Sequence, residues 1–428
     1  MKLSTLALFF ASACAWAASI PTQVSFNKDV LPIAQNRCQE CHRPGEIAPF
    51  SMLTYSETRP WAKAIKSSVL AKKMPPWFAD PKYGHFANDR SLSQQEIDTL
   101  VAWVDNGAKE GDPKDAPKPK EWMEGWNIPK PDLVLSMKEP FHIGAKEEVP
   151  YQYVIMPTEF KQDMWVQMAE ARPSDRGVVH HIVVFIRQPE NKWLRDQPVD
   201  VPFVPPGGGK DFNNTSGGGS DILMIYTPGM IPEIWRPGLA KKIPAGSDLV
   251  LQIHYTADGK DSQDHSKVGL VFAKEPPKER AMTFGSYNLT FKIPPGDPNY
   301  RVDGMKNTFP NGVEILSFFP HMHVRGKSFE YRAVYPDGST ETLLRVPKYD
   351  FYWQLDYRLA EPLKLPPGSK IECTAWYDNS PNNPANPDPK SLVSWGEQSW
   401  EEMMIGFYDV VIPADKSLRE LFQTKKGQ

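Results

Sequence analysis

The chain has 428 residues, of which 40% are hydrophobic and 24% are charged, and its formal net charge at pH 7 is -3. This length accommodates two or three domains, and the small net charge argues against a nucleic-acid partner. The 43 prolines argue against a mainly helical protein and favour many short strands and loops.

Residues 1–17 are typical of a secretory signal peptide. A positively charged start and a short apolar stretch precede an A-x-A cleavage site at Ala15-Trp16-Ala17, and Cys14 would leave with the signal. The apolar stretch is too short for an ordinary transmembrane helix, and no other stretch approaches one. We therefore expect a periplasmic or secreted bacterial protein with no membrane span.

Residues 24–110 are predicted to form a small helical domain. Short helices are expected over residues 30–36 and 56–73, the second with Trp61 and Ile65 on its buried face. The clearest helix covers residues 93–106, because Ser93 and Glu96 form a capping box at its start. Residues 111–131 are rich in Pro, Lys and Asp and are predicted to be an extended linker.

The helical segment contains a C-x-x-C-H motif formed by Cys38, Cys41 and His42. This motif is typical of haem c attachment, in which two thioether bonds hold the haem and the adjacent His binds the iron. A redox disulfide would be expected in a thioredoxin-like βαβ unit, and a zinc site would need a second cysteine pair; the sequence predicts neither. The motif therefore predicts a cytochrome c domain.

A second axial haem ligand is also expected. Met74 lies in a loop between two predicted helices and is favoured, with Met52 and His85 as the alternatives. The segment resembles class I c-type cytochromes, whose last helix packs against the first near the haem. This resemblance supports Met74.

From residue 132 onward, short β-rich runs alternate with turn signals. This texture predicts β-sandwiches rather than βαβ units, and Pro276-Pro277 is a plausible boundary between two of them, at 132–275 and 276–415. Residues 204–220 are rich in glycine and are predicted to form a loop. Cys373 lies in an apolar run and is predicted to be a buried strand thiol.

Five of the nine histidines fall in three local signals of the β-rich part: His180-His181, His254 and His321-Met322-His323. His321 and His323 would share one face of a strand and could grip one ion. His180 and His181 would point to opposite faces, so they could share a metal only at a bulge or a strand end. The three signals together indicate metal binding.

The sequence around these histidines resembles the type II, ascorbate-dependent copper monooxygenases, which include the peptidylglycine and dopamine enzymes. The resemblance covers residues 132–412 and rests on VVHHIVVF, LVLQIHY, PHMHVRG and Glu401-Glu402-Met403, in that order. It implies two jelly-roll-like sandwich domains and two copper ions. His180, His181 and His254 would bind the first copper. His321, His323 and Met403 would form the catalytic copper site, with Met404 as a rival facing the other side of the strand.

The family's chemistry implies an enzyme that hydroxylates a substrate C–H bond with molecular oxygen, on a small-molecule or peptide-like substrate. The cytochrome would replace ascorbate by passing electrons from a redox partner protein or another reductant to the copper sites. Phe319 and Phe407 stand where the peptide enzyme has Arg and Tyr, so a peptidylglycine substrate is not expected. Arg325 is interpreted as a surface residue beside a turn.

A different class of function is also open. The chain could be a non-catalytic periplasmic electron-transfer or copper-binding protein in which one or both copper sites are vestigial. All six predicted copper ligands are present, which favours the enzyme.

Overall fold

A computed structural model describes residues 23–122, 125–206, 220–416 and 422. The predicted signal peptide and most of the predicted glycine-rich loop lie outside these ranges. The chain forms two compact units. Of the described residues, the helical unit comprises 23–40, 50–75 and 92–119, and the β unit comprises 41–49, 76–91 and those from 120 onward. Within the described residues, no helix is both long and apolar enough to cross a membrane.

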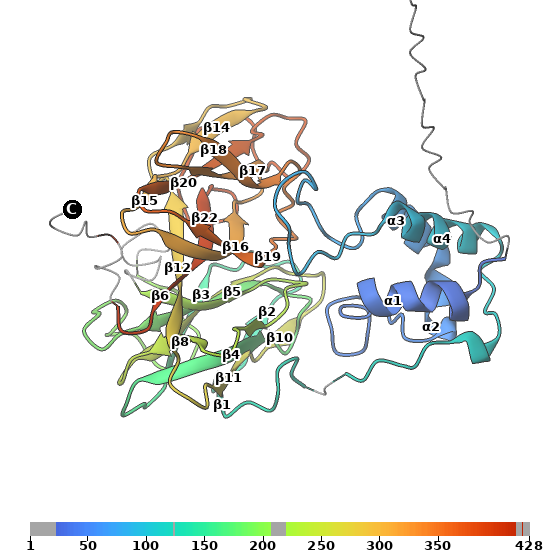
Figure 1. Cartoon of the computed structure of the whole chain (residues 1–428), viewed down its shortest axis with the longest axis horizontal. Helices are drawn as coiled ribbons and strands as arrows, with labels where there is room; N and C mark the ends of the chain where they lie inside the picture. The colour runs from blue at the N-terminus through green and yellow to red at the C-terminus, as the bar shows by residue number, and fades with distance from the viewer. Residues whose placement is uncertain (1–22, 123–124, 207–219, 417–421, 423–428) are drawn as a thin grey trace, which may run out of the picture. The chain divides into compact units, whose positions relative to one another are not determined.

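The helical unit is built from short helical elements around a small core (Figure 1). They are η1 (Phe26–Val30), α1 (Leu31–Arg37), α2 (Tyr55–Thr58), η2 (Arg59–Trp61), α3 (Ala62–Leu70), α4 (Gln94–Asp105) and η3 (Pro113–Asp115). The predicted capping box of α4 is confirmed, since the Ser93 hydroxyl accepts from the Glu96 amide and the Glu96 carboxylate accepts from the Ser93 amide. The predicted burial of Ile65 is confirmed, whereas Trp61 is 40% exposed and stacks on Phe50.

The protein is mostly β-sheet, and the β unit carries all of its described strands. One nine-stranded sheet has the order β1-β11-β4-β8-β12-β22-β16-β19, with β7 paired to β4. Its strands are β1 (Leu133–Ser136), β4 (Met164–Arg172), β7 (Glu233–Ile234), β8 (Leu239–Ile243), β11 (Lys267–Phe272), β12 (Glu279–Tyr287), β16 (Val313–His321), β19 (Tyr357–Leu365) and β22 (Ile405–Pro413).

Two smaller sheets complete the sandwiches. The four-stranded sheet has the order β3-β9-β5-β6, with β3 (Gln152–Pro157), β5 (Val179–Arg187), β6 (Asp221–Tyr226) and β9 (Asp248–Tyr255). The five-stranded sheet has the order β14-β20-β17-β18, with β15 paired to β20, and consists of β14 (Tyr300–Asp303), β15 (Asn307–Phe309), β17 (Gly326–Val334), β18 (Thr340–Val346) and β20 (Ser369–Tyr377). Two further pairs join β2 (Phe141–Ile143) to β10 (Ser262–Asp264) and β13 (Lys292–Ile293) to β21 (Val393–Ser394).

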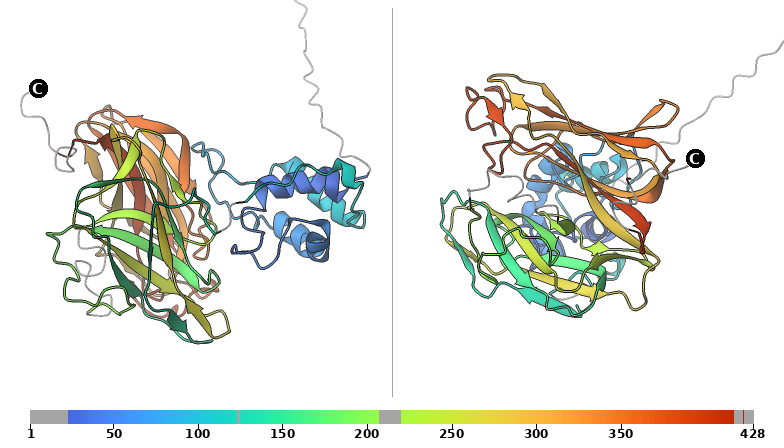
Figure 2. Two further views of the ribbon diagram at one scale, coloured as in Figure 1. Left: turned by 90° about the horizontal axis from the view of Figure 1, so that it is seen from below. Right: turned by 90° about the vertical axis from the view of Figure 1, so that its left-hand side faces the viewer.

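Each smaller sheet packs on its own part of the nine-stranded sheet and encloses a separate core. Val166 and Leu251 lie in the first core, and Phe318 and Tyr331 lie in the second. Cys373 on β20 is 1% exposed, which confirms the predicted buried thiol. Figure 2 shows the green and the orange-to-red halves of this unit as neighbouring layers.

The two halves share the nine-stranded sheet because β8 pairs in parallel with β12. The predicted boundary at Pro276-Pro277 falls between β11 and β12. A third apolar cluster joins the outer face of the four-stranded sheet to the other half, since it contains Tyr153 and Phe185 together with Phe319 of β16. Side chains alternate between the two faces of a strand. In the four-stranded sheet, one set therefore faces the first core and the other set faces the second sandwich.

Candidate metal centre

A β-bulge brings the His180-His181 pair to one side of its strand. In the β5–β9 ladder, Val179 lies opposite Tyr255 and His181 lies opposite His254, so His180 is the extra residue. An extra residue breaks the alternation of side chains, which re-aims His180 toward its neighbours. The sequence analysis allowed His180 and His181 to share a metal only at a bulge or a strand end, and they lie at a bulge.

The three histidines form a compact group. One ring nitrogen from each of His180, His181 and His254 lies within 4.8 Å of the others, and all three residues are buried. We call this group the histidine trio. The ring centroids are 5.0 to 5.5 Å apart.

Hydrogen bonds determine which nitrogens of the trio are available. The Nε2 of His180 lies 3.0 Å from the Phe351 carbonyl oxygen, which can only accept, so Nε2 carries the proton and Nδ1 keeps its lone pair. That Nδ1 lies 3.3 Å from the Nδ1 of His181. The Nδ1 of His254 is buried and has no hydrogen-bond partner in the described part of the chain. A buried nitrogen without a partner is costly, and a bound metal ion would relieve that cost.

Burial keeps these imidazoles neutral. Desolvation lowers the pKa of His180 to about 4, against the smaller opposing effect of its hydrogen bond to Phe351. Desolvation, followed by the neighbouring histidines, holds the pKa of His181 and of His254 well below the ordinary value. Neutral imidazole is the form that binds a metal, so the trio is ready to ligate at neutral pH.

The second set of predicted ligands begins at the end of β16. His321 and His323 have ring centroids 5.3 Å apart, and both are buried. The Nδ1 of His321 donates to the Gln354 side-chain oxygen at 2.6 Å, which leaves Nε2 as its free nitrogen. The Nδ1 of His323 faces the Glu401 carbonyl at 3.4 Å, and its Nε2 is buried without a partner among the described residues. We call these two residues the histidine pair.

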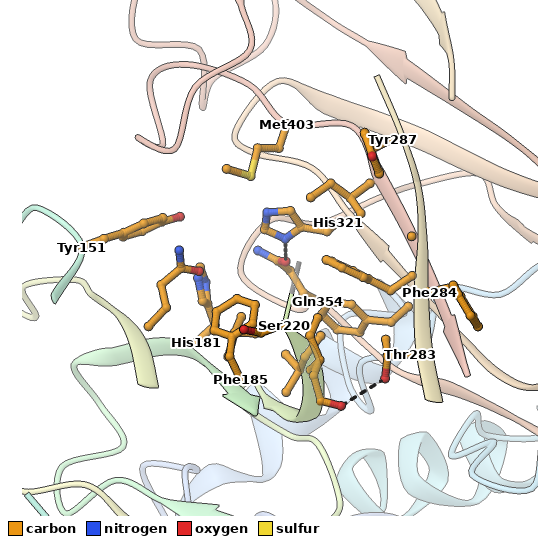
Figure 3. A pocket seen from close by; sticks show the side chains of 18 residues that line it. Tyr151, His181, Phe185, Ser220, Thr283, Phe284, Tyr287, His321, Gln354 and Met403 are labelled. Atoms are coloured by element: carbon orange, nitrogen blue, oxygen red, sulfur yellow. Dashed lines mark hydrogen bonds between the residues drawn. The ribbon is translucent and has the colours of Figure 1, made fainter. Parts of the chain in front are cut away.

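The two candidate methionines have different surroundings. Met403 is 5% exposed and lines a cavity together with His321, and Figure 3 shows its sulfur beside that ring. Met404 is fully buried in the core of the second sandwich. Only Met403 therefore offers its thioether on the side of the histidine pair.

The segment that carries Met403 is tied to the histidine pair by Glu402. Its carboxylate accepts from the backbone amides of His323 at 2.8 Å and of Arg325 at 2.6 Å. Desolvation raises the pKa of Glu402 to about 8, in spite of these hydrogen bonds. Arg325 is itself buried, and its guanidinium donates to Asn379 and to the Trp400 carbonyl. The interpretation of Arg325 as a surface residue is therefore wrong, because its charge and donors position the loop before Met403.

The histidine trio and the histidine pair meet at one cavity. The rings of His181 and His321 have centroids 5.9 Å apart, and both residues line a cavity of about 240 Å³ (Figure 3). The Tyr151 ring lies across the trio, with its centroid 4.6 Å from that of His254. The donor set suits copper, since imidazoles accept both of its oxidation states and a thioether favours Cu(I).

No sequence signal marks several residues that shape this site. Tyr151 contacts the histidines from just before β3, and Phe351 and Gln354 contact them from the loop before β19. Each acts through a contact between distant parts of the chain, which periodicity and motifs do not register. His142 and His265 lie outside this site and make hydrogen bonds to Gln263 and to the Met137 carbonyl.

The residues of the predicted haem site fall in both units. Cys38 follows α1 in the helical unit, whereas Cys41 and His42 begin the 41–49 segment of the β unit. Neither Cys38 nor Cys41 is in a disulfide. A C-x-x-C-H spacing without a disulfide is the pattern to which haem c is attached.

The three candidate axial ligands differ in their surroundings. Met74 is partly buried at the end of the 50–75 segment of the helical unit. Met52 is 2% exposed and belongs to the core of that unit. His85 lies in the β unit, where its carbonyl accepts from the Ala360 amide at 2.8 Å. Met74 remains the predicted ligand.

Comparisons with known proteins give no family. No protein-family model matches the chain, and no curated protein matches it. Solved structures that match include the major capsid protein P2 of bacteriophage PM2, at 10% identity over 67% of this chain and 99% of that one, with a TM-score of 0.26. The PNGF-II structure matches at 8% identity over 67% of this chain and 65% of that one, with a TM-score of 0.27. The VP2 particle of infectious bursal disease virus matches at 9% identity over 72% and 76%, with a TM-score of 0.22.

Proposed function

We propose that this chain is a copper- and haem-dependent monooxygenase that hydroxylates a C–H bond, exported to the periplasm or secreted, as the predicted signal peptide implies. The balanced reaction is R–H + O₂ + 2 e⁻ + 2 H⁺ → R–OH + H₂O. Two copper ions would supply one-electron redox chemistry and a site for oxygen, and haem c would supply a one-electron carrier. The observation that carries the proposal is the meeting of neutral histidines from both sandwiches, and of Met403, at one cavity.

The chain's own residues would divide the work between two ligand sets. The trio offers imidazoles and no thioether, which suits a copper that passes electrons. The pair with Met403 borders the cavity, which suits the copper at which oxygen and substrate meet. Gln354 and Phe351 would hold the rings of His321 and His180 in the required tautomers.

The 41–49 segment offers a route by which a haem could serve the trio. Glu46 forms an ion pair with Arg176 at 3.0 Å, and Arg176 lies just before β5. Cys41 and His42, two of the three predicted haem-binding residues of the motif, belong to this same segment. This supports electron entry through the haem to the trio.

The metal content of the purified, exported protein tests the proposal. We expect two coppers by elemental analysis and one haem by pyridine spectrum per chain. His181→Ala and His321→Ala should each lower the copper content by one ion and leave the haem unchanged. His142→Ala, at an exposed histidine outside the site, is the matched control and should keep both coppers.

Oxygen uptake coupled to a hydroxylated product would then support the enzyme. One haem with no tightly held copper, even after copper loading, would contradict the proposal. The chain would then be a cytochrome joined to a β-sandwich scaffold.

A further inference from the structure

The cavity between the two histidine groups has a mostly apolar wall, into which polar side chains such as Gln252 and Tyr287 also project. Aromatic and aliphatic side chains from both sandwiches supply it: Phe185, Ile222, Ile225, Phe284, Phe319 and Phe407. None of the described residues that line the cavity is Asp, Glu, Lys or Arg.

Most of the polar groups in the wall are already engaged. The Thr283 hydroxyl bonds the Asp409 carboxylate at 2.5 Å, and the Ser220 hydroxyl accepts from Asn191 at 3.1 Å. Gln354 is held by its hydrogen bond to His321. A ligand therefore meets few groups that could solvate a charge.

Tyr151 supplies one group that is available. Its hydroxyl points into the cavity beside His181 and Met403 in Figure 3, and it makes no hydrogen bond within the described part of the chain. A phenol can donate one hydrogen bond to a hydroxyl or carbonyl oxygen. Its position next to the metal ligands would place such a polar group at the reactive end of the cavity.

The volume limits the size of the ligand. The cavity measures about 240 Å³, and an apolar cavity of roughly 150 Å³ is enough for benzene. One six-membered ring with a short substituent therefore fits.

We propose that the substrate class is a compact, uncharged, apolar molecule the size of one ring, with at most one hydroxyl or carbonyl group that Tyr151 can contact. This inference rests on the proposed function for the reaction, whereas the binding preference rests on the wall of the cavity before copper is bound. Burying an unpaired charge is costly, so charged analogues of the same shape should be rejected.

Three ligands of nearly equal size compare a neutral molecule with an anion and a cation: benzyl alcohol, benzoate and benzylammonium. Their binding to the haem-containing protein is measured by calorimetry at neutral pH before copper is loaded, so that neither a carboxylate–copper bond nor turnover occurs. We expect benzyl alcohol to bind at least about 100-fold more tightly than either ion. Equal or tighter binding of an ion, or no binding of any of the three, would overturn the proposal.

Two substitutions of Phe319, a residue of the cavity wall, test whether this cavity is the binding site. Phe319→Arg should reverse the preference toward benzoate, and Phe319→Leu should retain the preference for benzyl alcohol while admitting a larger neutral ring such as 2-naphthalenemethanol. Leu392→Arg is the control, because Leu392 is 59% exposed and lies outside the cavity wall. If both Phe319 variants bind all ligands as the parent does, the cavity is not the binding site.

A final comparison separates this inference from the proposed function. Copper, reductant and oxygen are then added to the complex with the preferred neutral ligand. Hydroxylated product supports both the substrate class and the monooxygenase function. Selective binding without product keeps the binding preference and contradicts the monooxygenase, whereas product from a charged substrate keeps the enzyme and overturns the substrate class.

Discussion

Met403 and Met404 are adjacent in the sequence and differ completely in what surrounds them. Met403 lines the cavity beside His321, and Met404 lies in the second core. Met403→Ile should lower the hydroxylation rate by at least the roughly 10–100-fold that loss of a metal's supporting partner costs. Met404→Leu should leave the rate within about twofold and cost less than about 1.5 kcal/mol of unfolding free energy, since the two side chains have similar volumes. Steady-state rates and urea unfolding of both variants make the comparison, and equal rates would remove Met403 from the site.

Gln354 connects the two histidine groups through hydrogen bonds. Its side-chain oxygen accepts from His321, and its side-chain nitrogen donates at 3.3 Å to the Phe351 carbonyl, which also accepts from His180. Gln354→Leu removes both contacts and frees the tautomer of His321. We expect Cu(I) affinity at the pair to fall about 10–100-fold.

Competition with a Cu(I) chelator measures this affinity. Gln354→Glu, which keeps an acceptor for His321, is the matched variant and should retain most of it. An unchanged affinity in Gln354→Leu would show that the bridge does not position the ring.

The residue types at the candidate site could be predicted, and the residues that support them could not. His254 stood out as one of three histidine signals in a chain with nine histidines, whereas Met403 was indicated only by the resemblance of its segment to the copper monooxygenases. Arg325 was misinterpreted because its partners, Asn379 and the Trp400 carbonyl, lie far along the chain. Burial of a charged side chain depends on such partners, which single-sequence patterns do not reveal.

At the scale of elements, local sequence signals predict a helix or strand when the residues that determine it are close together in the sequence. The α4 helix follows from its capping box, and the strands β3, β5, β9 and β22 follow from short apolar runs between turns. The bulge at His180 and the parallel pairing of β8 with β12 could not be predicted, because register between strands is set by long-range packing.

A cluster of charged side chains lies where the two sandwiches join. Glu233 of β7 pairs with Arg358 of β19 at 3.2 Å, and Asp356 bonds the same guanidinium at 2.6 Å. Two carboxylates therefore compete for one cation. Desolvation, opposed by Arg358 and reinforced by Asp356, raises the pKa of Glu233 to about 7.

This cluster predicts a pH dependence of stability. An acid whose pKa is raised on folding binds more protons in the native state, so stability falls as the pH rises from about 4.5 to about 7 and is level above that. Glu233→Gln removes this loss, so its unfolding free energy relative to the parent should increase across that range, by up to about 3 kcal/mol. Urea unfolding at several pH values measures the difference in unfolding free energy between the variant and the parent. A difference that does not change with pH would show that Glu233 is not the group that titrates.

At the scale of the whole molecule, the 41–49 segment is held to the β unit by a nearly buried carboxylate. Glu46 faces Arg43 at 3.2 Å, Arg172 at 3.5 Å and Arg176 at 3.0 Å, with its own side chain 9% exposed. Glu46→Gln leaves these guanidinium groups without their shared counter-charge. We expect a loss of about 3–5 kcal/mol of unfolding free energy, as for other broken buried pairs.

Glu279→Gln is the control for this variant, because Glu279 forms an exposed pair with Arg236 and should cost less than about 1 kcal/mol. Hydrogen exchange should also accelerate across residues 41–49 in Glu46→Gln alone. Similar losses in both variants would show that the segment is held by other contacts.

The division of the chain into compact units differs in detail from what composition indicates. The sequence suggested one continuous helical segment followed by a linker, whereas the 41–49 and 76–91 segments group with the β unit. Phe86, for example, forms a bridge with Leu359 of β19. Such excursions depend on side chains that pair across more than two hundred positions, so no local signal marks them.

Because β8 pairs with β12, the two sandwiches share one continuous sheet. We expect the two sandwiches to unfold as one cooperative unit because of this shared sheet. An ion bound at the trio, as proposed, would then stabilise by mass action the half that contains the histidine pair as well. Occupancy of one group would resist opening of the other.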